Sequence, residues 1–255
     1  MKIIGHRGAA GMALENTLES IRSAIKAGVD AVEVDVRLTQ DHHLVLSHDK
    51  HIGRVSPNST VVHETLLEEL RGLKLHNGKR IATLQEALKA VGTTPLIIDA
   101  KDSGWAQPLA RILHTHQSRS ISVISFNHDE LESFSALCPH VDTYALEHTS
   151  PLDVVHGAYE RRFTGIDINF WTLNPLTYYL ARRHNLKVIV YTVNHVWIAR
   201  FLKFLYPHIS ITTNNPDRLG FLSDIKKRER AIKRASTNRS QSRRSRTASV
   251  PKNRT

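Results

Sequence analysis

The sequence is poor in cysteine, because Cys138 is the only one among its 255 residues. A single cysteine excludes an intramolecular disulfide and a cysteine-rich structural zinc site, and it favours a reducing compartment. No apolar run approaches the roughly 20 residues that a transmembrane helix needs. The chain enters a strand-like segment within its first residues, which leaves no room for a signal peptide. We therefore expect a soluble, cytoplasmic protein.

Net charge is absent from most of the chain. Residues 226–255 contain twelve Lys/Arg and one acid, which accounts for the whole formal net charge of +11, so residues 1–225 are formally neutral. The basic segment is rich in Ser, Arg and Asn and is too polar to bury a core. We therefore predict a folded domain over residues 1–222 and a mostly disordered basic tail over residues 223–255. The sequence does not indicate the oligomeric state.

Short β-rich runs alternate with helical patterns along the first 220 residues or so. The expected strands are Lys2–His6, Ala31–Arg37, Pro95–Lys101, Ile121–Phe126, Val141–Leu146, Thr164–Asn169, Lys187–Thr192 and Ile209–Thr213. Helical periodicity separates most of them, as in Thr17–Ala27, Leu84–Val91 and Asn194–Leu205. Eight βα units of this size fit an α/β fold of the (β/α)8 TIM barrel type, which usually has about 250 residues. The rival fold, a doubly wound open sheet, lacks its usual Gly-x-Gly-x-x-Gly after the first strand.

One strand-like run breaks this alternation. Leu44–His48 follows the second strand too closely for a crossover helix, so the two runs are expected to form an antiparallel hairpin. With Asp41 and His42 as a two-residue turn, His48 lies opposite Asp35. The stretch from His51 to Arg80 reads as loops around one short helix near Glu64–Leu70, and we expect it to be a cap over one end of the barrel.

Polar residues gather at the ends of successive expected strands, where the active site of a barrel lies. They are His6 and Arg7 after the first strand, Glu33 and Asp35 on one side of the second, His48 at the end of the hairpin, and Asp99 and Lys101 on one side of the next strand. Any one of these residues, taken alone, is more often an ordinary surface or core residue. Together they would cluster inside a closed barrel, where unpaired charge is costly.

The three acids of this set indicate a metal site. Glu33, Asp35 and Asp99 offer only oxygen ligands, which suit one divalent cation, Mg²⁺ or Ca²⁺, better than Zn²⁺. We therefore expect these three residues to bind a single hard cation.

The remaining members of the set indicate phosphate chemistry. Arg7 and Lys101 add positive charge that can bind a phosphoryl group, and His6 and His48 titrate near neutrality, as a general acid and a general base require. No P-loop is present, which argues against hydrolysis of nucleoside triphosphates. The site therefore predicts phosphoryl transfer or phosphodiester cleavage.

At this point the chain resembles a known family, the glycerophosphodiester phosphodiesterases, from His6 to about Asp217. The motifs that carry the resemblance are His6–Gly8, Leu14–Thr17, Gly28–Thr39, Leu44–Asp49, Thr83–Leu88, Ile97–Lys101, Ser125–Phe126 and Tyr191–Asn194. The N-terminal motifs, with their ordered histidines and carboxylates, are the specific ones, and the later motifs arrive in the expected order.

The resemblance implies a TIM barrel with the hairpin as a small insertion, and hydrolysis of glycerophosphodiesters to glycerol 3-phosphate and an alcohol in lipid headgroup turnover. It also implies one divalent cation at Glu33, Asp35 and Asp99, with His6 and His48 as the acid and base pair. The third metal ligand is more often Glu in the family, so Asp99 could alter the distance to the metal.

Three further positions depart from the family pattern. Leu14 replaces a proline, Tyr191 replaces a tryptophan, and Asn214 stands where the family usually has aspartate in Thr-Asp-x-Pro. None of these changes removes a group that the resemblance assigns to catalysis.

Two other functions compete with this one. A barrel with weak or no catalysis could act through its basic tail, because clustered Lys and Arg bind RNA or anionic membranes in a salt-sensitive way. A related lysophospholipase D-type phosphodiesterase is the other alternative, although the secreted enzymes of that kind depend on disulfides. Glu147, Phe126 and Trp171 are weaker candidates for the site, the first near the metal and the others beside the alcohol of the substrate.

Overall fold

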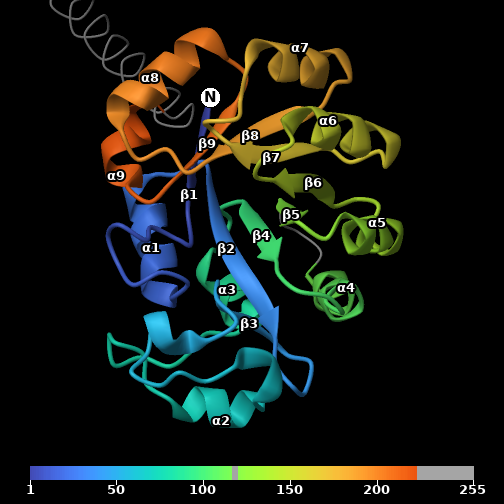
Figure 1. Cartoon of the computed structure of the whole chain (residues 1–255). Coiled ribbons are helices and arrows are strands. Elements are labelled where there is room, and N and C mark those ends of the chain that lie inside the picture. Colours follow the sequence, from blue (N-terminus) through green and yellow to red (C-terminus); the bar gives the residue numbers. More distant parts are fainter. Residues whose placement is uncertain (117–119, 223–255) are drawn as a thin grey trace, which may run out of the picture.

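A computed structural model describes residues 1–116 and 120–222, and the predicted basic tail lies outside these residues. In the described part of the chain, eight parallel strands close into a barrel, because β1 pairs with both β9 and β2 (Figure 1). The barrel strands are β1 (Lys2–Gly5), β2 (Ala31–Leu38), β4 (Leu96–Ala100), β5 (Ile121–Ser125), β6 (Asp142–Glu147), β7 (Gly165–Asn169), β8 (Lys187–Tyr191) and β9 (Ser210–Thr213). The predicted (β/α)8 TIM barrel is confirmed, and each predicted strand lies within two residues of its observed bounds.

Helices follow the strands, and all of them except the short second helix of the cap cover the outside of the barrel (Figure 1). They are α1 (Leu18–Ala27), α2 (Leu67–Gly72), α3 (Leu84–Ala90), α4 (Ala106–His114), α5 (His128–Leu137), α6 (Pro151–Glu160), α7 (Pro175–Arg183), α8 (Val196–Leu205) and α9 (Pro216–Leu219), with 3₁₀ turns η1 (Ile52–Arg54), η2 (Val62–Glu64) and η3 (Gly220–Leu222). Side-chain caps fix where several of them begin. Thr17 starts α1 and Thr83 starts α3 with capping boxes. None of the described helices is long and apolar enough to cross a bilayer.

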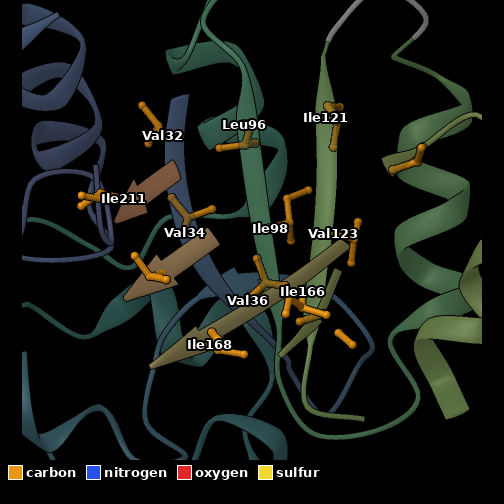
Figure 2. Close-up of a cluster of buried hydrophobic side chains, with 14 of the residues drawn as sticks. Val32, Val34, Val36, Leu96, Ile98, Ile121, Val123, Ile166, Ile168 and Ile211 are labelled. Atoms are coloured by element: carbon orange, nitrogen blue, oxygen red, sulfur yellow. The ribbon is translucent and has the colours of Figure 1, made fainter. Parts of the chain in front are cut away.

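The strands bury both of their faces, but in two different environments. Residues on the outer face pack against the helices, and Figure 2 shows Val32, Val34 and Val36 of β2 in this layer. Successive side chains of a strand alternate between faces, so Glu33 and Asp35 enter the barrel interior. A small apolar cluster fills part of that interior: Ile4, Ala31, Ile97, Ile124, Tyr144, Leu146 and Ile189. The alternation therefore decides which charged residues meet inside the barrel.

The predicted hairpin is present, but its predicted register is wrong by one residue. β3 (Leu44–Leu46) pairs antiparallel with β2, and Val36 lies opposite Leu46. Three residues rather than two make the turn, because the Thr39 N–H donates to the His43 carbonyl and His42 takes a left-handed φ of 59°. A three-residue hairpin loop with one left-handed residue is a common alternative to the two-residue turn. Ser47, and not His48, therefore bonds to the backbone of Asp35.

The segment that follows the hairpin is the predicted cap. It extends beyond the C-terminal end of β2 (Figure 1) and has a small core of its own, formed by Val45, Ile52, Val62, Leu70 and Ile81. Its short helix, α2, begins at Leu67, three residues later than predicted. The cap thus stands beside the end of the barrel at which the strands terminate.

Glu86 connects this cap to the barrel. Its carboxylate accepts hydrogen bonds from Arg71 of α2 at 2.9 and 3.0 Å and from the Thr83 N–H at 3.0 Å. Partial burial disfavours the charged carboxylate, but these hydrogen bonds outweigh that effect and lower the pKa of Glu86 to about 2. The ionised form of Glu86 is therefore a link between α2 and α3.

We predict that this link gives a defined acid dependence of stability. A pKa that is lower in the folded protein stabilises it fully above the ordinary value of 4.5, and this contribution disappears as the pH falls towards 2. Glu86→Gln should lower the free energy of unfolding at pH 7 by about 1 kcal/mol and flatten its decline between those pH values. Urea titrations across this range measure both effects, with the exposed Glu68→Gln as the control. An unchanged acid limb in Glu86→Gln would contradict the assignment.

Candidate active site

All seven residues singled out from the sequence line one cavity at the C-terminal ends of the strands. The cavity has a volume of about 390 Å³, and His6, Arg7, Glu33, Asp35, His48, Asp99 and Lys101 are among its lining residues. The C-terminal face is where the active sites of such barrels lie. The spatial grouping expected from the strand ends is therefore present in the structure.

The loop between β1 and α1 brings the first charged group into the cavity. Arg7 has a left-handed φ of 51°, followed by Gly8 at 83°, so the chain turns sharply at the end of β1. A Cβ atom on Gly8 would lie 2.3 Å from the Ser20 hydroxyl oxygen, so only glycine fits there. The turn directs the Arg7 N–H to Glu33 at 2.6 Å and its guanidinium Nε to Asp35 at 3.2 Å.

The three carboxylates predicted to bind a cation lie together. Each of Glu33, Asp35 and Asp99 is buried, and one carboxylate oxygen from each lies within 4.8 Å of the others. Lys101 forms ion pairs with Asp35, at 3.0 Å, and with Asp99. The Oδ1 atom of Asp99 has no hydrogen-bond partner among the described residues.

These observations fit one hard divalent cation. The donors are all oxygens, and Ca²⁺–oxygen distances of about 2.3–2.6 Å span a group of this width. An unpartnered buried carboxylate oxygen is costly unless a ligand or a water molecule completes it. The shorter side chain of Asp99 still brings a carboxylate oxygen into this group.

The three carboxylates of this cluster differ in the direction of their pKa shifts. Burial, together with Asp35 and Asp99, raises the pKa of Glu33 well above its usual range. Burial also raises the pKa of Asp99, to about 6, against the opposing effect of Lys101. For Asp35, burial is outweighed by Lys101 and Arg7, which lower its pKa. The protein's own two cations thus hold Asp35 ionised but do not neutralise all three acids, which favours an added cation.

The two histidines reach the cavity from different elements and have different partners. His6 donates its Nδ1–H to the amide oxygen of Asn214 at 2.6 Å, and burial and Arg7 lower its pKa to about 4. His48 donates its Nδ1–H to the carboxylate of Asp49 at 2.6 Å. Burial lowers the pKa of His48, while Asp35 and Asp49 oppose this shift. The predicted hairpin pairing placed His48 opposite Asp35, and that pairing is wrong. His48 nevertheless lines the same cavity as Asp35, because the loop after β3 brings it there.

Aromatic residues line the wall formed by the ends of β5 to β8. Phe126 stacks on His148 with ring centroids 4.5 Å apart, and His148 Nδ1 lies 2.7 Å from the Tyr191 hydroxyl. Trp171 is 76% exposed at the cavity rim. Phe126 and Trp171, the two weaker aromatic candidates from the sequence, therefore line the cavity. Glu147 is not one of the lining residues and instead accepts backbone N–H groups of the turn that follows it.

Sequence reasoning missed several residues of the site, and three of them have clear roles in its geometry. Asn16 bonds to Asp35 twice, Asn214 bonds to His6, and Asp167 lines the cavity from β7. Asn16 and Asn214 carry no charge pattern that singles them out. Asp167 did have a signal, because it is a lone acid between Ile166 and Ile168 at the centre of β7.

The barrel and its charged cavity define a phosphodiesterase-type site on a (β/α)8 scaffold, and comparisons with known proteins agree. The model of the glycerophosphoryl diester phosphodiesterase family matches residues 6–218. The chain therefore belongs to this family, and it is an enzyme that hydrolyses glycerophosphodiesters.

Individual relatives extend this finding. A glycerophosphodiester phosphodiesterase of Caldanaerobacter subterraneus is 25% identical over 207 residues, covering 75% of this chain and 85% of the relative. Human lysophospholipase D GDPD1 is 35% identical over 113 residues, covering 39% of this chain and 36% of that protein. A solved phosphodiesterase of Oleispira antarctica, in complex with the product sn-glycerol-3-phosphate, has a TM-score of 0.81 at 24% identity, covering 86% of this chain and 95% of that one.

We predict that Asn16 stabilises the site by holding Asp35. Its amide donates to the Asp35 carboxylate at 2.8 Å and accepts the Asp35 N–H at 3.1 Å. Asn16→Gly removes both bonds while tolerating the left-handed backbone, φ 53°, and should lower the free energy of unfolding by about 1–3 kcal/mol. Asn185→Gly is the matched control, since Asn185 is exposed and has φ 57°. Equal losses of stability in the two variants, measured by urea unfolding, would refute the role of the amide.

Proposed function

We propose that this chain hydrolyses glycerophosphodiesters in a metal-dependent reaction that yields glycerol 3-phosphate and an alcohol. The observation that carries the proposal is the buried group of Glu33, Asp35 and Asp99 beside two cationic side chains in one cavity. The product named for the Oleispira antarctica structure is consistent with this reaction.

In this proposal, Glu33, Asp35 and Asp99 hold one divalent cation, Mg²⁺ or Ca²⁺. When bound, such a cation polarises a phosphoryl oxygen and stabilises the charge that develops there. Arg7 and Lys101 supply fixed positive charge on the same side of the cavity, where they bind and orient the phosphodiester. The ion pairs of Arg7 and Lys101 with Asp35 keep both side chains in place before substrate arrives.

The different surroundings of the histidines support different roles for them in the proposed reaction. His6 is the general base, because its Nδ1 is engaged by Asn214 and its low pKa keeps Nε2 unprotonated at neutral pH. His48 is the general acid, because Asp35 and the hydrogen-bonded Asp49 carboxylate oppose the effect of burial on its pKa and favour its protonated ring.

The proton transfers follow from these roles. The nucleophile is either water or the glycerol 2-hydroxyl. His6 accepts its proton while the oxygen of the nucleophile forms a bond to phosphorus. The phosphorus–oxygen bond of the alcohol breaks, and His48 protonates the departing alkoxide. If the glycerol hydroxyl attacks, water then opens the cyclic phosphate.

We predict that one divalent cation binds per chain with the three carboxylates as ligands. Isothermal titration of the EDTA-treated, dialysed full chain with Mg²⁺ or Ca²⁺ should give one site, and activity should require the added cation. Glu33→Gln and Asp99→Asn should each weaken the site at least about tenfold. Asp142→Asn is the control, because Asp142 pairs with Lys187 on β8 and lies outside the three-carboxylate cluster. Full activity in a verified metal-free sample would disprove the metal requirement.

We predict that both histidines are required for turnover. His6→Ala and His48→Ala should each lower kcat at least about 10²-fold, because each removes one proton transfer. Release of glycerol 3-phosphate measures the rate, and circular dichroism with thermal unfolding verifies the fold. The exposed His63→Ala should keep normal turnover. A folded His48→Ala protein with near-normal kcat would show that His48 is not the acid.

A further inference from the structure

Asp167 is a buried acid that the proposed reaction does not use. It lies at the centre of β7, and its strand partners are Leu146 on β6 and Ile189 on β8, two members of the apolar cluster inside the barrel. Only 3% of Asp167 is exposed, yet it is one of the residues that line the cavity. The side chain therefore points into the barrel and forms part of the cavity wall.

The carboxyl group of Asp167 has unused hydrogen-bonding capacity. Its Oδ1 atom is buried and has no hydrogen-bond partner among the described residues, and no cationic side chain of the described chain forms an ion pair with it. A buried polar atom without a partner costs about 1–3 kcal/mol. Such a group at the wall of a cavity is available to a ligand as a hydrogen-bond partner.

Asp167 lies across the barrel from the metal site. The strand order places four steps between β7 and β2 in either direction around the ring, so Asp167 and Glu33 enter the interior from opposite walls. A cation bound by Glu33, Asp35 and Asp99 and a phosphate bound by Arg7 and Lys101 therefore leave Asp167 facing another part of the substrate.

The surroundings of Asp167 exclude two kinds of ligand. An anionic phosphoryl group is attracted to the cationic Arg7 and Lys101, which line another part of the cavity. A hard cation needs six or more oxygen ligands, and Asp167 is not part of the three-carboxylate group that could hold one among the described residues. Burial, reinforced by Asp99, raises the pKa of Asp167 well above its usual range, which lets the neutral acid donate as well as accept. A hydroxyl group matches these properties, because it also donates and accepts.

We propose that Asp167 is a substrate-binding residue that hydrogen-bonds a hydroxyl group of the glycerophosphodiester and so positions its polyol part. This inference rests on the proposed function. The hydroxyl has two possible sources: the terminal hydroxyl of the glycerol that all these substrates share, or a hydroxyl of the leaving alcohol.

The test compares two variants of Asp167 on three substrates with the full chain. The substrates are glycerophosphocholine, whose leaving alcohol carries no further hydroxyl; glycerophosphoglycerol, whose leaving alcohol does; and the propanediol analogue of glycerophosphocholine, which lacks the terminal glycerol hydroxyl. Asp167→Leu keeps the shape but removes the hydrogen bond, and Asp167→Asn keeps it. Ile189→Leu is the control for disturbance of the same interior layer.

We expect Asp167→Leu to lower kcat/KM for glycerophosphocholine by about 10²-fold, Asp167→Asn to recover most of the loss, and Ile189→Leu to lose little. The propanediol analogue should already be poor for the unaltered chain and should lose no more in Asp167→Leu. If the discrimination that disappears is instead between glycerophosphoglycerol and glycerophosphocholine, the contact is to the leaving alcohol, which also supports the proposal.

Two results would overturn it: an equal loss on all three substrates in Asp167→Leu, or a bound cation that disappears in Asp167→Asn. If the chain hydrolyses none of the substrates, the proposed function fails on its own. Calorimetric binding of glycerol 3-phosphate and of its deoxy analogue, propanediol phosphate, to the chain and to Asp167→Leu then decides the inference separately. Selective weakening of glycerol 3-phosphate binding supports it, and equal binding to both proteins refutes it.

Discussion

The arrangement of the cavity depends on three acidic side chains that the barrel buries. Alternation along the strands sends Glu33, Asp35 and Asp99 inward, where each is nearly inaccessible to water. Burying ionised groups is expensive unless partners compensate them. Arg7 and Lys101 provide part of this compensation, and both converge on Asp35. The uncompensated remainder is negative charge, which favours an added cation in the cavity.

Local backbone geometry makes this arrangement possible at the first strand end. The turn at Arg7 and Gly8 lets the chain leave β1, return a hydrogen bond from Gly8 N–H to the carbonyl of Glu33 at 2.8 Å, and start α1 against it. Ser20 of α1 then donates its hydroxyl to the carbonyl of Arg7 at 2.9 Å. The same short loop thus holds the Arg7 side chain in place and directs the Arg7 N–H to Glu33. It also carries Asn16, whose amide hydrogen-bonds Asp35. Such shared constraints explain why a tight turn, and not a flexible loop, carries Arg7.

The sequence predicted the strands well because they are buried on both faces and therefore read as apolar runs interrupted by inward charges. Grouping of the strand-end residues followed from parallel alignment alone. The hairpin register did not follow, because a three-residue turn with His42 in the left-handed region and a two-residue turn differ by a single position. Asn214 illustrates a further limit. It stood out only as a departure from the family pattern, and the structure shows it as the hydrogen-bond partner of His6. A neutral amide at this place does not stabilise an imidazolium as a carboxylate would, so the departure itself favours a histidine that stays uncharged.

The cavity has two chemically distinct walls, and this division favours one position for the phosphate of a diester. The wall formed by β1, β2 and β4 carries the charges, while the wall formed by β5 to β8 carries Phe126, His148 and Tyr191. Lys101 stands at the boundary, with its ammonium group 5.9 Å from the centre of the Phe126 ring. A phosphodiester that places its anionic centre on the first wall must lay its less charged substituents against the second. Asp167 is the inward acid on that second wall, so it supplies a polar contact where the rest of the wall offers mostly apolar and aromatic surface. The contrast between the walls would thus set the position of the phosphate, because a shift toward the second wall would take it away from Arg7 and Lys101 and place it near Asp167.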